Sequence, residues 1–127
     1  MRISSVGTAF PSYRVAQTEF TEKLRNYWGT KLPEPRMLSR LHANCGVESR
    51  NFVLPLEAYP ALVGFKATND TWIANAMELS QTCIARALGP LGLTAADISA
   101  IFFASVTGIA SPTIDARLIN LLPFPPT

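Results

Sequence analysis

Residues 98–106 constrain the fold more than any other part of the chain, because they form an almost unbroken apolar run with β-branched and aromatic members. Such a run favours a strand buried on both faces, as in a parallel sheet with helices on each side. The segment before it has apolar residues at helical spacing and predicts a long helix that begins at Asn69 or Asp70 and ends before Gly89 and Pro90. A long helix followed by a buried strand indicates an α/β fold.

Turn residues divide the rest of the chain into shorter elements. The expected elements are a strand at residues 3–9, a helix at 18–27 capped by Thr18, a helix from about residue 37 to Gly46, a strand at 50–54, irregular structure at 56–68, and a last helix that begins at Pro112 with Ser111 as its cap. This order of strands and helices supports the α/β assignment.

The length and apolar composition of the chain fit either part of a larger enzyme or a small domain. A chain of 127 residues fits one ordinary domain. Hydrophobic residues make up 48% of it and charged residues only 16%, so its apolar faces are expected to meet another part of a larger enzyme. A well-packed small domain is the alternative.

Positive charge is concentrated in the first 50 residues, which hold eight Lys and Arg against four Glu, a balance of +4. Residues 51–127 hold three Lys and Arg against five Asp and Glu, a balance of −2. The basic part suits an anionic ligand, although ordinary solvated charges would give the same pattern. It is too dilute for a nucleic-acid interface.

Neither secretion nor a membrane is indicated. The N-terminus does not resemble a signal peptide, and no apolar stretch approaches the roughly 20 residues of a membrane span. The two cysteines do not make a disulfide framework. A cytoplasmic location is therefore expected, with no nucleic-acid partner and no membrane partner.

Several segments are similar to one known enzyme family. The longest is residues 105–120, Ser-Val-Thr-Gly-Ile-Ala-Ser-Pro-Thr-Ile-Asp-Ala-Arg-Leu-Ile-Asn, and the others are residues 7–11, 56–60 and 69–73. Together they resemble bacterial type III polyketide synthases, the chalcone-synthase-like branch of the thiolase superfamily. The resemblance implies a thiolase-like α/β fold, in which residues 1–127 supply most of the first of two similar halves.

In that family a Cys takes the acyl group from an acyl-coenzyme A, malonyl-coenzyme A loses its carboxyl group, and the resulting carbanion attacks the thioester. The resemblance thus implies an acyltransferase of polyketide biosynthesis that acts as a homodimer and needs no cofactor. The family's Cys, His and Asn come later in the chain than Thr127. We therefore expect no catalytic residue here, a condensing domain truncated before its nucleophile, and no activity from this chain alone.

The same resemblance assigns substrate binding to the loop after the apolar run. Ser105, Val106 and Thr107 correspond to the strand end and loop that line the family's acyl-binding cavity, and Gly108 is expected to permit a backbone turn that other residues do not adopt. A tight strand-to-helix connection is the alternative. Ser111 matches the position from which family dimers place a side chain in the partner's cavity, and it is also a candidate helix cap.

Arg40 is the candidate for binding coenzyme A, because it matches an Arg that contacts the phosphates in plant members of the family. Met37 and Asn44 stand where that cluster has two Lys, and a solvated helix Arg is the alternative. His42 and Cys45 have the spacing to meet on a helix, but such a pair has no oxyanion donors. One His and two Cys do not make a usual zinc site, so no metal is expected.

Two other functions remain open. An enzyme similar to ketoacyl-acyl-carrier-protein synthase III would share the fold and perform a single condensation, although a different loop is expected there at residues 105–108. A non-catalytic, truncated paralogue that acts as a dimerisation or decoy module would need no nucleophile.

Overall fold

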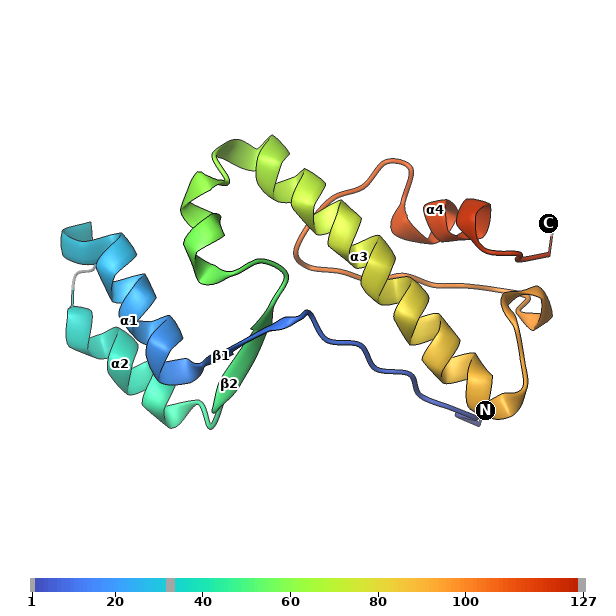
Figure 1. The fold of residues 1–127 in the computed structure, drawn as a ribbon, viewed down its shortest axis with the longest axis horizontal. Coiled ribbons are helices and arrows are strands. Elements are labelled where there is room, and N and C mark those ends of the chain that lie inside the picture. Colours follow the sequence, from blue (N-terminus) through green and yellow to red (C-terminus); the bar gives the residue numbers. More distant parts are fainter. Residues whose placement is uncertain (1, 32–33, 126–127) are drawn as a thin grey trace. The chain divides into compact units, whose positions relative to one another are not determined.

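The computed structural model describes residues 2–31 and 34–125. They fall into two compact units, coloured along the chain in Figure 1. The sheet unit is Pro11–Ala61, and the long-helix unit is Met1–Phe10 together with Leu62–Thr127. Both strands of the described residues belong to the sheet unit.

Two short strands form the sheet. β1, Tyr13–Ala16, pairs antiparallel with β2, Ser49–Phe52. Tyr13 lies opposite Phe52, and Ala16 lies opposite Ser49. The strand predicted at residues 50–54 is thus found, displaced toward the N-terminus.

The two helices of the sheet unit follow β1 and precede β2 in the chain. They are α1, Gln17–Trp28, and α2, Pro35–Asn44, and they pack against each other (Figure 1). Both confirm helices predicted from the sequence. Thr18 is not the cap of α1, because Ala16 holds that position and no side chain caps the helix.

A cluster of aromatic rings holds this unit together. The Phe20 ring of α1 stacks on the His42 ring of α2, with 5.8 Å between centroids, and lies 5.0 Å from the Phe52 ring of β2. Phe52 has an edge contact with Tyr59 at 5.8 Å, and the Arg50 guanidinium lies 5.7 Å from the centre of the Phe20 ring. Aromatic pairs of this geometry contribute about 0.5–1.5 kcal/mol beyond their burial. The cluster therefore links both helices to the sheet.

The long-helix unit is organised around α3, Gly64–Leu88. This helix ends where the sequence predicts, but it begins before Asn69 and Asp70, so the predicted cap is wrong. The Asn69 side chain is hydrogen-bonded to the backbone of Ile109 instead of to the first turn of its own helix. The predicted irregular stretch at 56–68 is also wrong in part, because Leu56–Ala61 forms a 3₁₀ helix and α3 starts at Gly64.

Residues 98–106 do not form a strand, which corrects the central prediction of secondary structure. A strand needs a neighbour whose backbone groups pair with its own, and residues 2–31 and 34–125 place no such neighbour beside this run. Part of the run is uncovered, with Phe102 93% and Val106 fully exposed, while Ile98 and Ile101 are half-buried. Phe103 is also half-buried, and its ring lies 6.4 Å from the Trp72 ring in an edge contact.

Residues 3–9 are not a strand either, for the same reason. The segment instead lies along the end of α3. A Cβ atom added to Gly7 would overlap the backbone carbonyl of Cys83 and come within 2.6 Å of the Ala87 nitrogen. Arg86 donates from Nη1 to the Thr8 carbonyl at 2.8 Å. Close approach to α3 is therefore what requires glycine at position 7.

The last helix, α4, is Ile114–Leu121 and packs against α3 (Figure 1). It buries Ile114 and Leu118, which are each 1% exposed and are spaced one helical turn apart. Thr113 is the residue at its N-cap position, so the prediction that Pro112 begins the helix and that Ser111 caps it is wrong.

Candidate functional site

The loop between residues 105 and 111 brings together four of the five predicted binding residues. Ser105, Val106, Thr107 and Ser111 are all exposed in it. The Thr107 backbone N–H donates to Ser105 Oγ at 3.1 Å, which fixes a tight bend at the start of the loop. The loop thus presents small side chains and hydroxyl groups rather than charges.

Two residues of α3 hold this loop. Asn69 accepts a hydrogen bond from the Ile109 N–H through Oδ1 at 2.9 Å and donates to the Ile109 carbonyl through Nδ2 at 2.8 Å. Gly108 lies against Trp72, and a Cβ atom at Gly108 would overlap the indole ring. The φ angle of Gly108 is not in the positive region, so close packing on Trp72 and not an unusual backbone turn requires glycine here.

The far end of the loop is held by α4. Arg117 donates from Nε to the Pro112 carbonyl at 2.8 Å and from Nη2 to the Ser111 carbonyl at 3.4 Å. The Ser111–Pro112 peptide bond is cis. Sequence reasoning missed the anchoring roles of Asn69 and Arg117, because their partners are backbone groups that no residue pattern reveals.

Arg40, the fifth predicted binding residue, belongs to the sheet unit. It lies in α2 with its side chain exposed, as does Arg36 one turn earlier. The structure therefore divides the predicted site residues between the two units, with Arg40 in one and the loop in the other.

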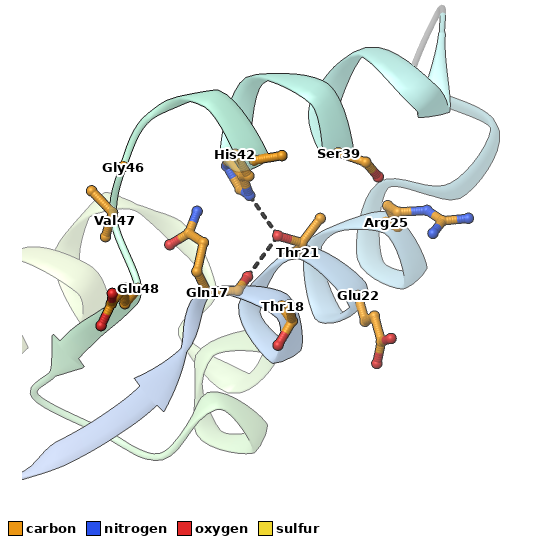
Figure 2. A pocket seen from close by; sticks show the side chains of 11 residues that line it. Gln17, Thr18, Thr21, Glu22, Arg25, Ser39, His42, Gly46, Val47 and Glu48 are labelled. Atoms are coloured by element: carbon orange, nitrogen blue, oxygen red, sulfur yellow. Dashed lines mark hydrogen bonds between the residues drawn. The ribbon is translucent and has the colours of Figure 1, made fainter.

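A pocket of about 620 Å³ lies between α1 and α2 in the sheet unit (Figure 2), and no pattern in the sequence predicts it. The Thr21 hydroxyl donates its one proton to the Gln17 carbonyl at 2.6 Å. The 2.7 Å contact between Thr21 Oγ1 and His42 Nδ1 must then be a hydrogen bond donated by the imidazole. Gln17 is buried, accepts from Arg50 Nε through Oε1 at 2.8 Å, and has an Nε2 without a partner in the described residues.

His42 and Cys45 do not form a catalytic pair. The Cys45 thiol donates to the His42 backbone carbonyl at 3.0 Å, while the imidazole Nδ1 is engaged with Thr21. Cys83, the other cysteine, lies half-buried inside α3. Among the residues that the structure describes, no cluster of three or more His, Cys, Asp or Glu is placed to hold a metal ion.

Charges near the loop are exposed. Lys66 and Asp70 form an ion pair along α3 on either side of Asn69, and the hydrogen bond to Asp70 raises the pKa of Lys66. Both side chains face solvent, so the pair contributes little to stability.

Comparison with known proteins identifies the family of this chain. Over 116 residues, 91% of this chain, it is 37% identical to 1,3,6,8-tetrahydroxynaphthalene synthase from Streptomyces peucetius subsp. caesius. The crystal structure of the 1,3,6,8-tetrahydroxynaphthalene synthase of Streptomyces coelicolor, a bacterial type III polyketide synthase, matches 98% of this chain at a TM-score of 0.85 and 30% identity. The chain belongs to the type III polyketide synthase family. The chain therefore forms part of a thiolase-like α/β fold, as the family resemblance implies.

Other matches agree with this type III polyketide synthase assignment. Phloroglucinol synthase from Pseudomonas fluorescens is 28% identical over 116 residues, which are 91% of this chain and 33% of that protein. The chain spans about a third of the length of the relatives that it matches, 31% of the Streptomyces peucetius synthase and 36% of the Streptomyces coelicolor structure. No family model matches the chain. In residues 2–31 and 34–125, no helix has both the length and the apolar character needed to cross a membrane.

Proposed function

We propose that this chain is part of an acyltransferase of polyketide biosynthesis, which condenses malonyl-coenzyme A onto an acyl-coenzyme A starter with loss of carbon dioxide. Residues 1–127 form the N-terminal part of its condensing domain, and the catalytic Cys, His and Asn lie outside this chain. The enzyme acts as a homodimer in the cytoplasm. The match of 98% of the chain to a solved type III polyketide synthase at a TM-score of 0.85 carries the proposal.

In this enzyme the 105–111 loop lines the cavity that holds the growing acyl chain. The exposed side chains of Ser105, Val106 and Thr107 support this role, because a loop that is anchored on two helices can present small groups at a fixed distance from a substrate. A large residue would take up space in such a cavity.

Replacing Ser111 tests the cavity. The variants are made in a chimera in which this chain replaces the matching third of the Streptomyces peucetius synthase. Ser111→Phe is expected to lower the yield of the longest product about tenfold in favour of shorter ones, because the ring occupies the space of the growing chain. Decarboxylation of malonyl-coenzyme A, which occurs at the nucleophile, should be retained. Product chromatography and release of labelled carbon dioxide measure the two effects.

Ser111→Ala is the matched control. Because Thr113 holds the cap position of α4, removing the Ser111 hydroxyl should leave both stability and product length unchanged. If Ser111→Phe folds and gives the parental product distribution, Ser111 does not face the cavity.

The second proposed contact is between Arg40 and the phosphates of coenzyme A. Loss of one charge-assisted hydrogen bond to a phosphate should weaken coenzyme A binding by the chimera about tenfold in Arg40→Ala. Arg36→Ala, also on the exposed surface of α2, serves as the control for a general loss of positive charge. Calorimetric titration with coenzyme A measures both variants. If Arg40→Ala and Arg36→Ala weaken coenzyme A binding equally, Arg40 contributes only to the general positive potential of the surface.

A further inference from the structure

The Asn69 side chain makes two hydrogen bonds to the backbone of one residue of the 105–111 loop, much as two paired residues of a β-sheet do. Its amide accepts from the N–H of Ile109 at 2.9 Å and donates to the carbonyl of the same residue at 2.8 Å. This arrangement satisfies both backbone groups of Ile109 and fixes the orientation of the Asn69 amide, because only Oδ1 can accept and only Nδ2 can donate.

Neither aspartate nor leucine can make both of these hydrogen bonds at position 69. Aspartate would keep the acceptor for the Ile109 N–H but would place a second acceptor against the Ile109 carbonyl. Leucine has a similar shape and can do neither. Asn75, two turns later in α3, uses its Nδ2 on the Thr71 carbonyl of its own helix at 2.8 Å and shows the ordinary role of an asparagine in this helix.

Trp72 lies nearly one turn after Asn69 on α3 and holds the adjacent residue of the loop. Gly108 packs directly on its indole, and Phe103, which precedes the loop, contacts the same ring system at 6.4 Å between centroids. Consecutive loop residues, 108 and 109, are thus fixed by two side chains of α3. Val106 and Thr107, by contrast, are exposed.

We propose that Asn69 is a positioning residue that determines the length of the acyl chain made by the enzyme, by fixing the loop of residues 105–111 against α3. This inference rests on the proposed function, in which the loop lines the acyl cavity. Releasing Ile109 leaves the loop attached mainly through Trp72 and Arg117 and lets its small side chains move relative to the substrate. The dimensions of the cavity then vary, while the nucleophile, which this chain does not supply, is unaffected.

The experiment compares Asn69→Leu, Asn69→Asp and the control Asn75→Leu in the chimera, with two independent measurements. Hydrogen exchange followed by mass spectrometry reports on the peptide that contains Ile109, and product chromatography with labelled malonyl-coenzyme A reports chain length against total decarboxylation. Asn69→Leu should accelerate exchange of the Ile109 amide about tenfold, since one backbone hydrogen bond is lost. It should also broaden the product distribution without a matching fall in decarboxylation.

Each outcome decides the proposal. Faster exchange at Ile109 with an unchanged product distribution overturns it, as does unchanged exchange in Asn69→Leu. Asn69→Asp, which retains one of the two hydrogen bonds, should be intermediate in both measurements, and it replaces Asn69→Leu if that variant does not fold. Asn75→Leu should match the parent in both measurements. If it changes exchange and product distribution as much as Asn69→Leu does, the effect comes from disturbing α3 in general, and the proposal is wrong. A chimera that forms no polyketide at all contradicts the proposed function instead, while the exchange data still test the contact.

Discussion

The 127-residue chain on its own is expected to self-associate and to raise the fluorescence of a hydrophobic dye such as ANS several-fold. Among the described residues, the buried apolar side chains are Val15, Ala95, Ile114 and Leu118. Large apolar side chains are exposed in much greater number, and Phe102 at 93% and Val106 at 106% exposure stand in the run that the sequence marks as buried. Apolar area left in water favours association.

Size-exclusion chromatography with light scattering, together with dye titration, measures this expectation. Phe102→Ser should lower dye fluorescence without loss of helical signal in circular dichroism, because its side chain is uncovered and lies outside the helices. A monodisperse monomer that binds no dye and melts cooperatively at high temperature would favour a complete small domain, the alternative that composition left open.

Gly7→Ala is expected to lower the stability of the fold much more than alanine at Gly89 does. The added Cβ would meet backbone atoms of α3, the Cys83 carbonyl oxygen and the Ala87 nitrogen, which cannot move aside without distorting the helix. Overpacking of this kind costs on the order of 3 kcal/mol. Gly7→Ala should therefore lower the free energy of unfolding of the chimera by about that amount.

Gly89→Ala is the matched control for this substitution. Gly89 has helical angles, φ −51° and ψ −49°, and a Cβ atom there would have no neighbour within 4 Å. Its effect on the free energy of unfolding should stay below about 1 kcal/mol. Urea unfolding of the two variants measures the difference. Equal stabilities would mean that residues 3–9 do not pack on α3 as described.

Local patterns were sufficient to predict the helices but not their first residues. α1 and α2 carry apolar residues at helical spacing, and Gly89 marks the end of α3. The sequence predicts Asn69 as a cap because asparagine is common at helix starts, whereas its actual partner lies 40 residues away in the chain. Ser111 is predicted as a cap for the same reason, but Thr113, an equally suitable residue two positions later, holds that position.

Two of the three predicted strands, at residues 3–9 and 98–106, are absent for a different physical reason. The apolar run at 98–106 and the β-branched residues of 3–9 favour an extended conformation, but a strand exists only where another backbone pairs with it. That partner is a tertiary feature and does not follow from the run itself. The binding loop could be located from the resemblance of residues 105–120, yet its anchors on Asn69, Trp72 and Arg117 required the structure.

Condensation by the chimera tests the central claim most directly. The chimera, the parent Streptomyces peucetius synthase and the isolated chain are each incubated with labelled malonyl-coenzyme A, and labelled carbon dioxide and polyketide products are quantified. We expect the chimera to form polyketide at a rate within about tenfold of the parent, because the chain supplies a matching third of the same fold. The isolated chain should form none, with or without Cys45→Ala. A chimera that folds like the parent yet releases no carbon dioxide and forms no product would contradict the assignment of this chain to a polyketide-forming enzyme.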